Sequence, residues 1–136
     1  MRKIALMAAM LGPLWWSTAL AQGLPPLKDD TRVQQEFLAA AIGDEIRKRC
    51  PSISARMLRV MARANDLERY ALDQGYAEAD IKALRRDESA KAWLRAQRDA
   101  YLAKNGVVAG DAASYCRLGM AEIERNSLTG WLLRAR

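Results

Sequence analysis

The chain has 136 residues, a length that suits one domain better than two, and it contains no histidine. The lack of histidine excludes zinc sites of the H-E-x-x-H type, the usual serine and cysteine triads, and C-x-x-C-H haem attachment. A formal net charge of +6 suits weak contact with anionic surfaces. No nucleic-acid reader motif accompanies it, so nucleic acid is not an expected partner.

Residues 1–21 have the pattern of a secretory signal peptide. Arg2 and Lys3 form a positive start, an apolar stretch follows, and Ala19-Leu20-Ala21 is an A-x-A cleavage signal. We expect cleavage after Ala21 and export to the periplasm. The alternative is an uncleaved membrane anchor. It is disfavoured because Pro13 interrupts an apolar run that is shorter than the roughly 20 residues a membrane span requires.

The rest of the chain divides into a leader and one domain. Residues 22–29 are expected to be an extended leader, because they contain Gly23 and the pair Pro25-Pro26. Residues 30–136 are expected to form a helical domain.

The first helix of that domain is predicted from about Thr31 to Arg49. Asp29 and Asp30 offer N-cap oxygens at its start, and basic residues in its last turn complement the exposed carbonyls. Pro51 then ends the helix. Its apolar positions form one stripe that should face the core, made of Phe37, Leu38, Ala41, Ile42 and Ile46.

The second helix is predicted to begin after Ser52 or Ser54, either of which can cap it, and to end at Gly75. Its apolar residues recur at steps of three and four, which predicts a seam that faces the core. The seam comprises Met57, Val60, Ala64, Leu67 and Ala71, and Ile53 and Met61 widen it.

Three further helices are predicted over about residues 78–85, 88–104 and 112–126, with Asp87 and Asp111 as N-caps of the last two. The inward stripe of residues 88–104 is Ala90, Trp93, Leu94, Gln97 and Tyr101. In residues 112–126 the shared face is Cys116, Gly119, Met120 and Ile123, so Cys116 should point inward. No segment shows the alternation of a strand. The predicted fold class is all-α: a small orthogonal bundle of about five helices with one disulfide, preceded by a signal peptide.

The chain contains two cysteines, Cys50 and Cys116. In an exported protein such a pair predicts a disulfide, which would join the corner after the first helix to the last long helix. A loop of about 66 residues would be closed, and chain entropy gives such a bond on the order of 4 kcal/mol. Two free buried thiols are the alternative.

Asp44 and Glu45, in a locally basic stretch before Cys50, are the best carboxylate candidates for a functional role. One of them could be an acid with a raised pKa, or an acidic ligand that binds a cation. The alternative is ordinary ion pairing along one helix. In that case Asp44 pairs with Lys48 and Glu45 with Arg49, each four residues on.

A basic group flanks Cys50 and could bind a phosphate, an anionic headgroup or an acidic protein patch, since arginine binds oxyanions in a fork. The alternative is a solvated helix face. The group comprises Arg47, Lys48, Arg49, Arg56, Arg59 and Arg63.

The tail is amphipathic and could dock on a partner or lie at a membrane surface. The alternative is that it packs on its own domain, since about ten residues cannot hold a helix alone. The residues concerned are Leu128, Trp131, Leu132, Arg134 and Arg136.

Several short blocks occur in a recognisable order. They are Leu24-Pro25-Pro26-Leu27, Ala41-Ile42-Gly43-Asp44-Glu45-Ile46-Arg47 before Cys50, Ser52-Ile53-Ser54-Ala55-Arg56-Met57, Gly75-Tyr76, Tyr115-Cys116-Arg117 and Glu122-Ile123. In this pattern the chain resembles a family of small exported alphaproteobacterial proteins of unknown function. The resemblance supports export and the role of the cysteines, and it implies no activity.

These observations favour a non-enzymatic periplasmic protein with a structural or protein-interaction role. We expect no catalytic residue, metal or cofactor, and another envelope protein as partner. Peripheral membrane contact is compatible with the charge. The alternative function is a binding module for an anionic small molecule or lipid headgroup, held by Arg56, Arg59 and Arg63. An enzyme would have to depend on Asp44 and Glu45.

Overall fold

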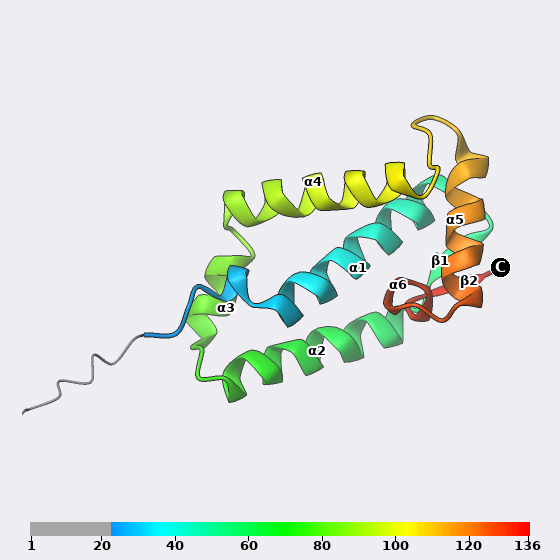
Figure 1. Cartoon of the computed structure of the whole chain (residues 1–136). Coiled ribbons are helices and arrows are strands. Elements are labelled where there is room, and N and C mark those ends of the chain that lie inside the picture. Colours follow the sequence, from blue (N-terminus) through cyan, green and yellow to red (C-terminus); the bar gives the residue numbers. More distant parts are fainter. Residues whose placement is uncertain (1–22) are drawn as a thin grey trace, which may run out of the picture.

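The computed structural model describes residues 23–136, so the predicted signal peptide lies outside the described residues. Within that range the chain is mainly helical, which confirms the predicted all-α class (Figure 1). The elements in order are η1 (Leu27–Asp29), α1 (Thr31–Arg49), β1 (Ile53–Ala55), α2 (Met57–Asp73), α3 (Glu78–Leu84), α4 (Glu88–Lys104), α5 (Ala112–Glu124), α6 (Leu128–Trp131) and β2 (Leu133–Ala135). No helix of this range is long and apolar enough to cross a membrane.

Helix α1 is the central element, and it lies between α4 and α2 in Figure 1. It begins at Thr31 because the Asp30 carboxylate accepts a hydrogen bond from the Val33 amide at 2.9 Å. It ends at Arg49, and Cys50 occupies the C-cap position. Both ends match the prediction, because caps act within a few residues of the helix they bound.

Two short strands correct the sequence prediction. Ile53–Ala55 pairs antiparallel with Leu133–Ala135, so that Ile53 lies opposite Ala135 and Ala55 opposite Leu133. The prediction that Ser52 or Ser54 caps the second helix is therefore wrong. Helix α2 begins after Arg56, which makes no side-chain cap bond. The local cap signal is overridden by pairing with a strand almost 80 residues away, a separation that helical periodicity cannot reveal.

The later helix ends are close to those predicted. Gly75 follows α2 with a φ of 97°, and Gly106 follows α4 with a φ of 77°, a backbone region that glycine enters without steric cost. Helix α5 ends at Glu124 rather than Asn126. Asn126 itself has a φ of 49°, a left-handed conformation that cannot continue the helix.

The core consists of two clusters, one toward each end of α1. The larger one joins the C-terminal half of α1 to α4, α5 and the small sheet, and comprises Ile42, Ile46, Cys50, Ile53, Leu102, Tyr115, Leu118 and Leu133. The smaller one joins η1 and the start of α1 to α2 and the segment before α3, and comprises Leu27, Val33, Ala71 and Tyr76.

Several predicted core positions are instead exposed. The first half of the α2 seam is exposed: Met57 and Met61 are 58% and 59% exposed. Further along, Leu67 is half-buried and Ala71 is buried. Ile53 is buried as well, but it belongs to β1 and not to α2. Phe37 and Met120 are also exposed. The periodicity located the apolar faces, but α2 makes few contacts with α1, so the apolar side chains near the start of α2 are left exposed.

The two ends of the described chain are held by packing. Leu27 is buried in a turn of 3-10 helix, so the segment expected to be extended is partly folded, and the Tyr76 hydroxyl donates to the Pro25 carbonyl at 2.8 Å. At the other end Leu132 and Leu133 are buried. The tail therefore packs on its own domain.

Candidate functional site

Cys50 and Cys116 are joined by a disulfide, as predicted. Their sulfurs are 2.09 Å apart and their Cα atoms 5.1 Å apart. The bond connects the C-cap of α1 to α5, and both cysteines belong to the larger core cluster or pack against it. It therefore holds the corner that leads into β1 and α2 in a set position relative to the last long helix.

Asp44 and Glu45 are both engaged in ion pairs. Asp44 contacts Arg47 and Lys48 of the same helix. Although partial burial acts to raise it, hydrogen bonds from Lys48 and Arg47 lower the pKa of Asp44 overall. Glu45 accepts a hydrogen bond from Arg49 at 3.0 Å and lies 3.9 Å from a guanidinium nitrogen of Arg98 on α4. This arrangement matches the ion-pair alternative, and no group of acidic or cysteine side chains in residues 23–136 is arranged to hold a metal.

Two arginines at the start of α2 hold the C-terminal tail: Arg56, which directly precedes the helix, and Arg59 within it. Arg56 donates from Nε to the Leu133 carbonyl at 2.9 Å, and Arg59 donates from Nη1 to the Trp131 carbonyl at 3.1 Å. The Arg59 guanidinium also lies 4.7 Å from the centre of the Trp131 ring, within cation–π range. The C-terminal segment formed by α6 and β2 is thus attached to the start of α2.

Arg63 lies 5.9 Å from the centre of the same Trp131 ring, but its hydrogen bonds go to a carboxylate. It forms an ion pair with Glu36 of α1, in which Nε lies 3.2 Å from Oε2. Its charge is balanced by that carboxylate. Of the three arginines expected to hold an anionic ligand, one is therefore neutralised and two donate to peptide carbonyls. Arg63 is therefore not available to an anion, whereas Arg56 and Arg59 keep guanidinium N–H groups that no carboxylate of residues 23–136 contacts.

An open hollow of about 430 Å³ lies beside the start of α2, and we call its walls the Met–Arg surface. Leu58, which sequence periodicity did not place in any seam, is 85% exposed there. Met61 lies one turn further along the same helix and is also exposed. The Met–Arg surface therefore comprises the walls of the hollow together with Met61: Ala55, Arg56, Met57, Leu58, Arg59, Met61 and Arg134.

The other predicted basic residues lie partly beside this surface. Arg47 and Met57 both line a neighbouring hollow of about 220 Å³ between α1, α2 and the end of the chain. Arg49 lines neither hollow and pairs with Glu45. The structure therefore brings Arg47, Arg56 and Arg59 to one region and leaves Arg49 and Arg63 outside it.

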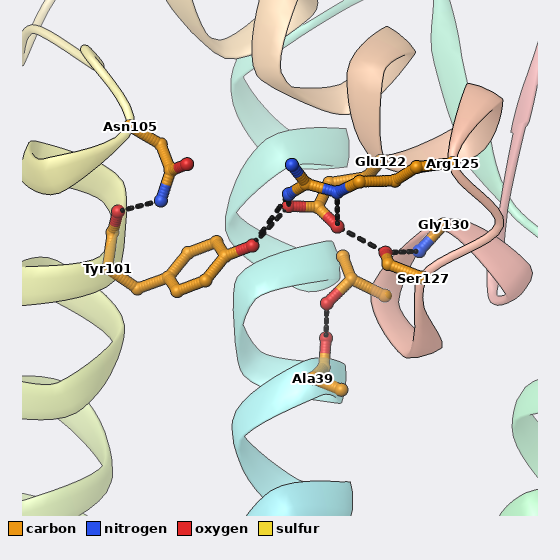
Figure 2. Close-up of polar contacts among 8 residues, drawn as sticks. Ala39, Tyr101, Asn105, Glu122, Arg125, Ser127 and Gly130 are labelled. Atoms are coloured by element: carbon orange, nitrogen blue, oxygen red, sulfur yellow. Dashed lines mark hydrogen bonds and ion pairs between the residues drawn. The ribbon is translucent and has the colours of Figure 1, made fainter.

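The most buried charged group is one that sequence reasoning missed. Glu122 on α5 is only 1% exposed. Its carboxylate accepts hydrogen bonds from the Tyr101 hydroxyl of α4, the Ser127 hydroxyl and the Arg125 guanidinium (Figure 2). Ser127 in turn accepts from the Gly130 amide at 2.9 Å and caps α6. The cluster ties α4, α5 and α6 together.

The hydrogen bonds of this cluster hold neighbouring elements of the fold together. Burial, followed by the hydrogen bond to Glu122 and the charge of that carboxylate, raises the pKa of Tyr101 and keeps the phenol protonated. Every buried side-chain nitrogen and oxygen of residues 23–136 has a hydrogen-bond partner. The sequence did contain a signal for this site: Glu122 lies three and four residues from Gly119 and Leu118, on the apolar face of α5, with Arg125 three residues on.

No curated protein and no solved structure matches the chain. One family model does match, over residues 25–134, which is nearly all of the described range. The resemblance to an uncharacterised family is confirmed to that extent, whereas alphaproteobacterial origin and export stay predictions. The chain belongs to a family of unknown function, DUF5333.

Proposed function

We propose that this protein is a non-enzymatic, exported helical protein whose Met–Arg surface binds a segment of another envelope protein. The partner segment carries apolar side chains next to carboxylates. The observation that carries the proposal is the composition of this surface, which combines exposed apolar side chains with three arginines and no acidic residue.

Exposed apolar side chains are unusually clustered on the Met–Arg surface. Single exposed apolar residues are normal on proteins, whereas a contiguous patch suggests an interaction site. Met57, Leu58 and Met61 lie within about one turn of α2 and are all more than half exposed. Methionine is flexible and polarisable, so it adapts to the shape of a partner.

The charged part of the surface defines the partner. Among residues 23–136, Arg56, Arg59 and Arg134 have no carboxylate within 4.0 Å, although most other arginines of α1 and α2 do. Carboxylates on a partner would supply the missing complement and would select it electrostatically.

The backbone beneath the surface is held in place, although its methionine side chains are free to adapt. The surface lies on the pair β1–β2 and on the first turn of α2, and the Arg56 amide donates to the Leu132 carbonyl at 2.8 Å. The disulfide holds the same corner to α5. A preorganised surface loses less conformational entropy on binding.

A binding role is preferred over catalysis because Asp44 and Glu45 are each ion-paired within α1. A periplasmic location is supported by the signal-peptide pattern of residues 1–21 and by the disulfide, which persists in oxidising compartments.

The test is site-specific photo-crosslinking in the native host, with the crosslinker placed at Leu58 and mass spectrometry of the adduct. The control position is Leu72, which is exposed near the other end of the same helix. We expect a defined adduct from position 58 alone, joined to a peptide rich in Asp or Glu beside apolar residues. Arg134→Glu should reduce its yield. Equal labelling from both positions, or a crosslinked peptide without carboxylates, would refute the proposal.

A further inference from the structure

Another apolar depression lies near the start of α1, beside the smaller core cluster to which Val33 belongs. A hollow of about 230 Å³ lies between α1, the end of α3 and the first half of α4. A second one of about 230 Å³ lies between α1, α2 and α3. Both are walled by Val33, Phe37, Leu84 and Arg85, so they adjoin along one turn of α1. We call the pair the Phe37 trough.

We propose that the Phe37 trough binds a single-chain anionic amphiphile, such as a fatty acid, with its hydrocarbon chain along the trough and its anionic end at Arg85 and Lys91. This site shares no residue with the Met–Arg surface and is independent of the function proposed above.

The hydrocarbon part of the ligand follows from the lining of the first hollow. Phe37 and Trp93 are exposed there although both are large and apolar, and Leu84 and Leu94 complete the wall. The polar side chain of Gln34 is already used, because its amide donates to the Lys28 carbonyl at 2.9 Å. A hydrocarbon chain needs no hydrogen bonds from these walls.

A peptide in extended form fits this lining poorly. The walls are formed mainly by helices, whose backbone amides and carbonyls are paired within each helix. The backbone of an inserted strand would lose its hydration without finding new partners.

The anionic end follows from the charges at the first hollow. It is lined by Lys28, Arg85 and Lys91 and by no carboxylate, whereas Glu68 lines the second hollow. Lys28 donates to the Ser89 hydroxyl at 2.9 Å and lies 3.7 Å from the Asp87 carboxylate, and Lys91 pairs with Glu88 at 2.8 Å. Arg85 is the least committed: its side chain is 65% exposed, and the nearest carboxylate oxygen, on Glu68, is 3.9 Å away. Its guanidinium can therefore bind a ligand carboxylate or phosphate in a fork.

Isothermal titration calorimetry on the full chain tests this, with laurate below its micelle concentration as the probe. Dodecyltrimethylammonium, which has the same chain length and the opposite charge, is the ligand control. We expect laurate to bind at least ten times more tightly. Equal affinity for the two would overturn the anionic assignment, and no binding of laurate would overturn the site.

Matched variants place the binding. Phe37→Asp and Arg85→Glu should each weaken laurate binding at least tenfold. Two control variants carry matching substitutions outside the trough. Leu58→Asp changes an apolar residue of the Met–Arg surface, and Arg86→Glu reverses the charge of an exposed neighbour of Arg85. Both should leave the affinity for laurate within twofold of the unmodified protein. If Phe37→Asp does not fold, as judged by circular dichroism, Arg85→Glu carries the test because its side chain is exposed. A reversed pattern would overturn the location.

Two further measurements test whether laurate binds next to Trp93 and whether the protein binds a membrane surface instead of a single lipid chain. Trp93→Phe keeps the aromatic wall, so it should preserve the calorimetric signal while abolishing most of the laurate-induced change in tryptophan fluorescence. Sedimentation with phosphatidylglycerol vesicles examines a membrane surface as the ligand. Binding to vesicles without binding to monomeric laurate would overturn the single-chain assignment.

Discussion

Replacing Glu122 by Gln is the sharpest test of how the end of the chain is held in place. The substitution keeps the size of the side chain but removes its negative charge and turns one acceptor oxygen into a donor. In the folded protein Tyr101, Arg125 and Ser127 all donate to this carboxylate, and Glu122 is 1% exposed. At least one of these donors would then face another donor.

The expected loss follows from the number and type of these bonds. A hydrogen bond to a charged group contributes about 1.5–3 kcal/mol, and breaking a buried ion pair costs about 3–5 kcal/mol. Arg125 is half exposed, so water can solvate it when its partner is lost, and the hydroxyls of Tyr101 and Ser127 can rotate to accept. We therefore expect Glu122→Gln to lower the free energy of unfolding by about 2 kcal/mol, and Glu122→Ala by about 4 kcal/mol.

Urea unfolding followed by circular dichroism measures this difference. The matched control is Glu124→Gln, an exposed glutamate two positions along the same helix, which should change stability by less than about 0.5 kcal/mol. If Glu122→Gln were as mild as its control, the network would not be stabilising the junction of α4, α5 and α6, and the reasoning would be refuted.

Three other predictions concern separate features of the fold. Cys50→Ser and Cys116→Ser should each lower the free energy of unfolding in urea by about 4 kcal/mol. The double variant should lose no more than either single variant, because all three lose the same bond, and additive losses would contradict a shared bond. Gly43→Ala should raise the free energy of unfolding by about 0.5–1 kcal/mol, because the new Cβ would meet its nearest neighbour at an ordinary 3.6 Å. Gly119→Ala should lower the free energy of unfolding by at least about 1 kcal/mol, because the new Cβ would lie 2.3 and 2.7 Å from two isoleucine side chains. Hydrogen bonds from a neighbouring hydroxyl and amide lower the pKa of Asp87 from 3.8 to about 2, so its carboxylate stabilises the fold above about pH 4 and this contribution is lost as the pH falls toward 2. Asp87→Asn should therefore flatten the pH dependence of the melting temperature over that interval, and an unchanged slope would show that the carboxylate is not linked to folding.

The sequence alone predicted the helices whose ends carry local signals. Asp30 and Asp87 cap α1 and α4 as predicted, and Pro51 and Gly75 follow helices that end where expected. These signals work because a cap, a proline or a left-handed glycine acts on atoms within a few residues of itself. The pairing of the only two cysteines was predictable for a different reason, since a chain with two cysteines offers one intramolecular pair.

The tertiary structure decided what those helices cover and what they leave open. The strand after Cys50 exists because residues 133–135 return to it, and Ser54 pairs there instead of capping a helix. Glu122 became a central buried group only because Tyr101 and Ser127 approach it from other elements. The exposed face of α2 and the Phe37 trough arise in the same way. An amphipathic pattern states which face of a helix is apolar, but whether that face is buried depends on long-range packing that no local pattern contains.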